Sequence, residues 1–210
     1  MTEVTTPRRR RATQTRSKAT VQRILDAATD LIVERGAHGL TMSEIAKRAD
    51  LVIGSLYQYF ADRSAICRAI LIRHQAEART LLHHYVAGAQ TLPALTEALS
   101  RSFDAYFEIL QRDRLIIGLW AIVQTDPDLQ ALDLEDTLQN ARFLAGVAAP
   151  MLPGVGTDRL IATFTMLIQF SLYAGRLARD MPDPIAQEIP ATYKAMFLES
   201  LESLQRVSQT

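Results

Sequence analysis

Apolar residues recur every three to four positions along most of this 210-residue chain, and this helical period constrains the fold more than any other feature. The first stripe consists of Val21, Ile24, Leu25, Ala28, Leu31 and Ile32. Two glycines, Gly36 and Gly39, follow it as stop signals. The sequence has no sustained alternation of apolar and polar residues, and no Asn-Gly or Asp-Gly pair that would indicate a hairpin. We therefore predict an all-α protein.

A capping signal marks a short helix directly after the first long one. Thr41 stands at the N-cap position and Glu44 follows three residues later, which is the pattern of a capping box. Leu40 and Ile45 are placed to pack across the first turn as a hydrophobic staple. These residues predict a helix over 42–49.

A second short helix is predicted after a break at Asp50-Leu51. It covers about residues 53–60, and Asp62 is placed to cap the helix that follows. Helices of this length are unstable alone, so both must pack against the long helix that precedes them. In a helix-turn-helix, the second helix of such a pair lies in the major groove of DNA. Leu56, Tyr59 or Phe60 can face inward here, while Gly54, Ser55, Tyr57 and Gln58 can face outward.

The formal net charge of zero conceals an uneven distribution. Residues 1–68 carry 12 Lys and Arg against seven Asp and Glu, and the rest of the chain carries the opposite excess. Within residues 1–24 the balance is +6, without a periodic apolar face. We interpret residues 1–19 as a flexible basic arm suited to a polyanion, because each neutralised phosphate releases counterions. A solvated tail without a partner is the alternative.

Helical stripes continue beyond residue 62 and are divided by clear stops. One stripe covers residues 95–110, and Asp126-Pro127 offers a cap and a first-turn proline for the next helix. A loop rich in proline and glycine covers residues 150–156. Two long helices are predicted at 160–175 and 193–207, with a connector between Pro182 and Pro190.

Three motifs in the N-terminal part of the chain agree with one known pattern. They are Arg23-Ile24-Leu25-x-Ala27-Ala28 with Glu34-x-Gly36, then Thr41-x-Ser43-x-Ile45-Ala46-x-x-Ala49, and then Gly54-Ser55-Leu56-Tyr57-x-Tyr59-Phe60-x-Asp62-Arg63-x-Ala65-Ile66. Together they resemble the DNA-binding domain of the tetracycline-repressor (TetR/AcrR) family, and they span about residues 20–68. The resemblance implies a homodimeric, ligand-responsive transcriptional regulator, usually a repressor that binds a palindromic operator. It also implies an N-terminal three-helix helix-turn-helix domain over residues 20–68 and a larger all-α domain for effector binding and dimerisation over residues 69–210.

The resemblance further implies which residues meet DNA. Thr41 and Ser43 match positions that touch the DNA backbone, and Arg63 matches a basic residue that meets phosphate. The consecutive arginines Arg8, Arg9, Arg10 and Arg11 would form an arm that reaches into a neighbouring groove. The candidates on the recognition helix are Ile53, Gly54, Ser55, Tyr57, Gln58 and Tyr59.

Two departures from the family pattern concern the turn and the start of the recognition helix. Asp50 stands where the family often has glycine, and Val52 stands where it has a polar cap, so the capping hydrogen bond is missing. Ile53 is apolar where family members commonly present a polar or basic side chain. Ile53 either contacts a thymine methyl group or packs against the protein.

Two roles for the C-terminal helices also follow from the resemblance. The last two long helices would form the dimer interface, with Phe164, Ile168, Leu172, Gly175, Met196, Phe197, Ser200, Leu201 and Leu204 as candidates. The central helices would enclose a small organic effector, with Phe103, Asp104, Tyr106, Phe107, Trp120, Gln124, Phe143 and Phe164 as candidates. Both stripes can instead face their own core, and Asp104 can be a solvated carboxylate.

Signals for other functional classes are missing from the sequence. The four histidines lack metal-ligand spacing, and Gly154-Val155-Gly156 lacks the strand and third glycine of a nucleotide-binding motif. We therefore expect no metal, no cofactor and no catalytic residue. Cys67 is the single cysteine, so no internal disulfide can form. Apolar runs fall short of about 20 residues, so we expect a cytoplasmic protein without a membrane partner.

A rival interpretation is an all-α small-molecule-binding or catalytic protein whose basic arm is incidental. DNA binding that is absent, or that does not depend on salt, would favour this alternative.

Overall fold

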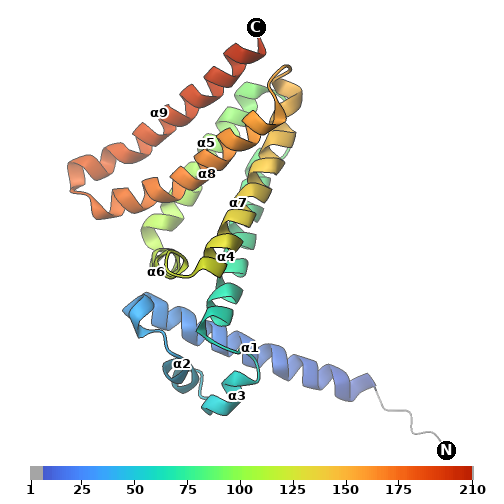
Figure 1. Ribbon diagram of the computed structural model, residues 1–210, viewed down its shortest axis with the longest axis vertical. Helices are drawn as coiled ribbons and strands as arrows, with labels where there is room; N and C mark the ends of the chain where they lie inside the picture. The colour runs from blue at the N-terminus through green and yellow to red at the C-terminus, as the bar shows by residue number, and fades with distance from the viewer. Residues whose placement is uncertain (1–6, 210) are drawn as a thin grey trace, which may run out of the picture. The chain divides into compact units, whose positions relative to one another are not determined.

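Helices account for the regular structure of the part of the chain that the structure describes (Figure 1). The computed structural model describes the backbone of residues 7–209, and the side chains of residues 16–209 apart from His38. No strand occurs among residues 7–209, which confirms the all-α prediction. The helices are α1 (Pro7–Arg35), η1 (Ala37–Gly39), α2 (Met42–Arg48), α3 (Ile53–Tyr57), α4 (Arg63–Val86), α5 (Leu92–Arg112), α6 (Arg114–Val123), α7 (Pro127–Ala148), η2 (Ala149–Met151), α8 (Thr157–Asp180) and α9 (Asp183–Ser208).

The chain divides into two compact units. Unit 1 contains the chain as far as Ile72 and also the segment Gly118–Thr125, and unit 2 contains the remainder. The predicted domain over residues 69–210 stays a prediction, and residues 69–72 and 118–125 cluster with unit 1. Gly118 lets this segment lie close to α1. A β-carbon at this position would collide with the side chain of Ile32, and glycine has none.

Unit 1 is built around the apolar stripe of α1. Ile24, Leu31 and Ile32 are almost fully buried, as are Ile45 of α2 and Leu56 of α3. Helix α2 packs against α1 and α3 packs against α2, which supports helices too short to be stable alone.

Helix caps follow the sequence signals closely. The Thr41 hydroxyl accepts a hydrogen bond from the backbone N–H of Glu44 at 3.2 Å, and Asp62 accepts one from the N–H of Ala65 at 2.7 Å. Asp126 caps α7 by accepting from the N–H groups of Asp128 and Leu129. Val52 makes no side-chain cap at α3, as expected.

Three predicted boundaries differ from the structure. Helix α1 begins at Pro7, so residues 7–19 are helical and not an irregular arm. Proline is tolerated in the first turn, and no glycine or second proline interrupts the chain before Gly36. Helix α3 ends at Tyr57 and not at residue 60, because Tyr59 N–H bonds the nearer carbonyl of Leu56.

The third difference is the connector predicted between Pro182 and Pro190. Helix α9 begins at Asp183 and contains Pro190 within it. A proline removes one backbone hydrogen bond inside a helix, and α9 continues past Pro190 for about five further turns.

Unit 2 is a helical bundle in which α8 packs against α5, α7 and α9. In Figure 1, α8 and α9 run side by side. Its core is drawn from α5, α7, α8 and α9, with Leu95, Leu144, Phe164 and Phe197 among the buried side chains. Gly175 of α8 lies so close to Leu110 of α5 that a β-carbon would collide with it.

Helix α8 also carries apolar side chains that are not buried in this core. By length and composition alone it could cross a membrane, and only 22% of its most apolar window is buried. Gln169 within it donates a hydrogen bond to the hydroxyl of Thr137 at 2.8 Å. The helix is thus a core element of unit 2 that also carries an exposed apolar side.

The backbone of Asp50 gives a test of the turn between α2 and α3. Its φ of 53° lies in the left-handed region, which favours glycine and tolerates Asp or Asn. We expect Asp50→Val to lower the free energy of unfolding by roughly 1–2 kcal/mol, and Asp50→Gly to leave it unchanged or raise it. Urea unfolding followed by circular dichroism measures both. Asp50→Asn is the matched control, and equal stability of the valine variant would contradict the account.

Candidate nucleic-acid interface

The outward face of α3 is uncharged and exposed. Leu56 is fully buried and anchors the helix, whereas Ile53 and Tyr57 are 44% and 52% exposed. Gly54 is exposed and has no atom within 4 Å of the place where a β-carbon would stand. The helix therefore presents an open backbone and uncharged side chains to its surroundings.

The other predicted DNA-binding residues of unit 1 are also at the surface. Thr41, Ser43 and Arg63 are exposed at the starts of α2 and α4, and Gln58 and Tyr59 are exposed just after α3. Ser55 is half-buried. The side chains of Arg8, Arg9, Arg10 and Arg11 lie outside the described residues. The contacts of all these residues with DNA stay a prediction.

One basic residue near this surface is already paired within unit 1. Arg48 donates to both carboxylate oxygens of Glu34, at 2.6 and 2.8 Å. These hydrogen bonds hold the pKa of Glu34 below its usual value and raise the pKa of Arg48. A further ion pair joins Arg35 to Glu44 at 3.3 Å. Both pairs tie α2 to α1, and Lys47 remains an exposed cation on α2.

Sequence reasoning did not count Val52 among the residues of this surface. It is 74% exposed, which exceeds every other large apolar side chain in the described part of the chain. The available signal was the apolar residue itself at a position that usually carries a cap.

The predicted effector-binding residues occupy different surroundings. Phe103 contacts the rings of Phe107 and Tyr193, at 5.7 and 4.4 Å between ring centroids. Phe143 stacks on His83 at 3.8 Å. Phe164 is buried in the core of unit 2. Their role as ligand contacts remains a prediction.

Three further candidates for effector binding are Asp104, Trp120 and Gln124. Asp104 is exposed and forms an ion pair with Lys194 of α9 at 2.8 Å, and its contact with a ligand stays a prediction. Trp120 and Gln124 belong to the segment that joins unit 1.

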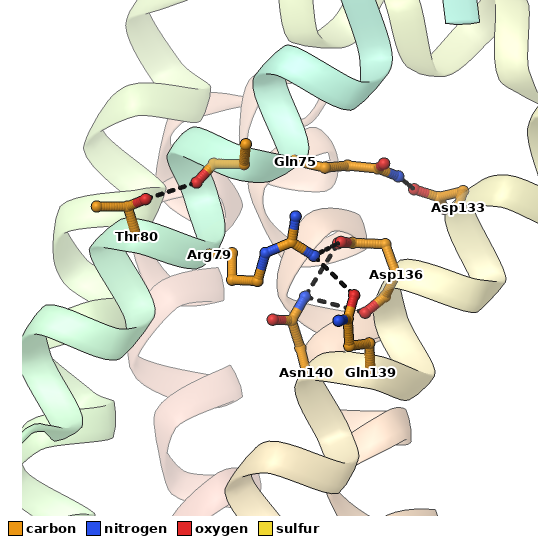
Figure 2. A network of polar contacts seen from close by, with 8 residues as sticks. Gln75, Arg79, Thr80, Asp133, Asp136, Gln139 and Asn140 are labelled. Atoms are coloured by element: carbon orange, nitrogen blue, oxygen red, sulfur yellow. Dashed lines mark hydrogen bonds and ion pairs between the residues drawn. The ribbon is translucent and has the colours of Figure 1, made fainter.

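A polar network runs between α4 and α7 in unit 2 (Figure 2). Gln75 donates to Asp133 at 3.3 Å, and Arg79 forms an ion pair with Asp136. Asn140 donates to a carboxylate oxygen of Asp136 at 2.9 Å, while its own buried oxygen has no hydrogen-bond partner.

Ionisable groups beside this network are shifted by burial. Burial raises the pKa of Asp133 and of Tyr106. Burial also lowers the pKa of His74, although carboxylates including Asp133 and Asp136 oppose the shift. Burial thus disfavours the charged form of each of these groups. No group of three His, Cys, Asp or Glu residues suited to a metal occurs among the described residues.

A groove of about 280 Å³ lies elsewhere in unit 2, between α5 and α9. It is lined by Leu92, Pro93, Thr96, Glu97, Leu198, Leu201, Glu202 and Gln205. None of the predicted effector-binding residues lines it.

The predicted dimer residues are mostly turned toward their own unit. Phe164, Phe197, Leu201 and Leu204 are buried in its core, and Gly175 packs on α5. Ile168, Leu172 and Ser200 are half-buried, and Met196 is 56% exposed. The role of these residues at a dimer interface stays a prediction.

The exposed apolar side of α8 consists of other residues. Met166, Phe170, Tyr173 and Leu177 are spaced by three or four positions and are each 38–52% exposed. They form one continuous stripe, which we call the α8 stripe.

Titration of His74 gives a test of the buried polar groups. Because its folded pKa lies below its unfolded value, its contribution to stability is complete above about pH 6.5 and is lost as the pH falls through the folded pKa. We expect the free energy of unfolding to fall from pH 7.5 to 5.5 by no more than about 1.4 kcal/mol per pH unit for this proton.

His74→Gln should flatten this decline in urea unfolding measured across the same pH range. His84→Gln, at an exposed position of the same helix, is the matched control and should leave the decline intact. A His74 variant with the full decline would assign the pH dependence to other groups.

Comparisons with known proteins agree with this geometry. The family described as "Bacterial regulatory proteins, tetR family" matches residues 24–70. The transcriptional regulator UidR of Escherichia coli K12 is 24% identical over 80% of this chain and 88% of its own. The repressor KstR of Rhodococcus jostii is 29% identical over 68% of this chain and 75% of its own.

A solved structure shares the fold. The complex of SmeT with triclosan, a protein otherwise described as the repressor of a Stenotrophomonas maltophilia multidrug efflux pump, superposes with a TM-score of 0.66. It is 19% identical and covers 88% of this chain and 91% of its own. With an exposed α3 inside the matched segment and relatives along most of its length, this chain carries the DNA-binding domain of the tetR family of bacterial regulatory proteins and is a helix-turn-helix transcriptional regulator.

Proposed function

We propose that this regulator is a repressor that binds a palindromic operator as a homodimer and releases it when a small organic effector binds. The observation that carries the proposal is the outward face of α3. One side chain, Leu56, holds this helix to unit 1, while Ile53, Gly54, Tyr57 and the following Gln58 stay exposed. Backbone contacts from Thr41, Ser43 and Arg63 would set the register of the helix in the major groove.

The length of α3 supports a dimer. A five-residue helix offers few contacts to base edges, so a single copy binds weakly. Two copies related by a twofold axis double the contacts on a palindromic site.

The surface that we assign to the partner copy is the α8 stripe, together with the exposed Met196 of α9. Contiguous exposed apolar side chains of this kind mark interaction sites in soluble proteins. A stripe on one side of α8 packed against the same stripe of a second copy would bury Met166, Phe170, Tyr173 and Leu177 together. This placement also gives the apolar composition of α8 a role outside a membrane.

Effector binding is assigned to unit 2. SmeT, which shares the fold, forms a complex with triclosan, a small organic molecule. The network of α4 and α7 places a few polar groups in an apolar bundle, which is the pattern of small-molecule sites. The buried oxygen of Asn140 and Nε2 of His83 both lack a hydrogen-bond partner and can bind polar groups of a ligand. We keep Phe103, Tyr106, Phe107 and Phe143 as the apolar contacts.

These assignments place DNA binding and effector binding in different parts of the chain. Residues up to about 68 bind DNA, and residues 69–210 supply the effector and dimer contacts except for the segment 118–125 that joins unit 1. A regulator of this kind acts where the chromosome lies, so we place it in the cytoplasm. Relatives of this family are regulators, and we assign no catalytic activity.

The operator experiment comes first. Genomic DNA fragments that the purified protein retains are sequenced, and binding to the enriched site is measured by fluorescence anisotropy over a range of salt concentrations. We expect a palindromic site and a strong salt dependence. Replacing Arg8, Arg9, Arg10 and Arg11 by alanine should weaken binding and reduce the salt slope by about 0.9 for each phosphate that is no longer neutralised.

Arg112→Ala is the matched control, because this arginine is 82% exposed on α5 of unit 2. An unchanged slope in the four-alanine variant would show that the arginines do not contact DNA. Retention of no duplex at all would favour the rival interpretation of a small-molecule-binding or catalytic protein.

A separate variant tests whether the α8 stripe is the dimer interface. Phe170→Glu places a charge at the centre of the α8 stripe, so we expect a monomer in sedimentation velocity and at least tenfold weaker operator binding. Leu134→Glu, at a 51% exposed apolar position on α7, is the control and should stay dimeric. A dimeric Phe170→Glu protein would exclude this surface as the interface.

A further inference from the structure

We propose that Val52 and Ile53 read thymine, by packing their methyl groups against thymine 5-methyl groups in the major groove. This inference rests on the proposed function, since it presumes that α3 enters the groove. It names the base chemistry of the operator: each half-site carries a T·A pair opposite the start of α3.

The exposure of the pair is the first observation. Val52 is 74% exposed and Ile53 is 44% exposed, while their neighbour Leu51 is half-buried. Neither side chain contributes to the core of unit 1. Leu56 is the side chain of this helix that is buried there. The two apolar side chains therefore stand next to each other at the surface of unit 1, at the end of α3 that would approach the bases first.

The position of Val52 is the second observation. It is the N-cap residue of α3, and it makes no side-chain hydrogen bond to the helix. Serine, threonine or aspartate at this position would bond the free N–H groups of the first turn. Valine forgoes that local stabilisation and offers two methyl groups instead, which favours a role for the methyl groups outside the unit.

The chemistry of the groove selects the base. Guanine is usually read by Arg or Lys, cytosine by Asp or Glu, and adenine by Asn or Gln, whereas the thymine methyl group is met by apolar side chains. Helix α3 has the sequence Ile-Gly-Ser-Leu-Tyr and carries no charged residue. Its first turn thus lacks the groups that read guanine or cytosine and has those that read thymine.

Gly54 removes the obstacle to close contact. No atom lies within 4 Å of the point where its β-carbon would stand, so the open space is on the outside of the helix. A side chain there would hold the backbone away from the base edges. Without one, Val52 and Ile53 on the preceding positions can reach van der Waals distance of a methyl group.

The test removes the methyl groups from DNA and leaves every hydrogen-bonding group in place. In the operator found by genomic selection, each thymine is replaced in turn by deoxyuridine, and binding by the full-length protein is measured by fluorescence anisotropy. We expect about fourfold weaker binding for each methyl group that the protein contacts, at one or two positions of each half-site. Deoxyuridine at the remaining thymines should have no effect and is the internal control.

The same test is repeated with two protein variants, Val52→Ser and Ile53→Ala, so that changes in the protein and in the DNA can be combined. Val52→Ser can cap α3, so its thermal unfolding temperature should equal or exceed that of the parent chain. Its binding should nevertheless weaken about fourfold for each methyl group contacted, and deoxyuridine at the sensitive position should cause no further loss of affinity. Leu134→Ala, an exposed apolar residue of unit 2, is the matched control and should retain full sensitivity to deoxyuridine.

Two outcomes would overturn the inference while the proposed function stands. The first is tight operator binding that no deoxyuridine substitution weakens. The second is a variant at Val52 or Ile53 whose sensitivity to deoxyuridine equals that of the parent chain. If Val52→Ser instead changes the sedimentation coefficient, the exposed pair contacts a second copy and not DNA, and the inference also fails. A protein that binds no duplex at all ends the proposed function itself.

Discussion

The burial of Leu56 is the contact on which the DNA-binding surface depends. Helix α3 has five residues and cannot persist alone, so its orientation is set by the one side chain that it buries. Helix α3 packs against α2, which packs in turn against α1. Ile53, Gly54 and Tyr57 are exposed and thereby free to serve a ligand. The exposed residues that would contact bases can therefore change without loss of the fold, because Leu56 alone anchors the helix.

Unit 2 follows a different principle, since it combines a large apolar core with polar groups that are buried beside it. Asp133 and His74 are shifted toward their neutral forms, and Arg79 and Asp136 neutralise each other. A bundle selected for stability alone would replace such groups by apolar ones, because buried ion pairs and unsatisfied oxygens add little to stability. Their presence is consistent with a unit that binds a molecule carrying both apolar and polar parts.

The sequence predicted most of the local structure and only part of the surfaces. Thr41, Asp62 and Asp126 act as caps as predicted, because capping depends on neighbours within four residues. The start of α1 and the course of α9 through Pro190 were missed, because a basic stretch and a proline lower helix propensity without forbidding a helix. The inward and outward sides of α8 could not be separated, because this helix is apolar on both and periodicity does not say which one the core takes. Phe164 lies inward and Phe170 outward for that reason.

The ion pair between Arg48 and Glu34 has a consequence for how fast the protein finds its target. Encounter with DNA is accelerated by the long-range field of unpaired positive charge, and that field decays over roughly 8 Å at physiological ionic strength. A cation neutralised within 2.6 Å by a carboxylate contributes almost nothing to it. The attraction therefore comes from the other exposed cations of unit 1, which include Arg16, Lys18, Arg23, Lys47 and Arg63.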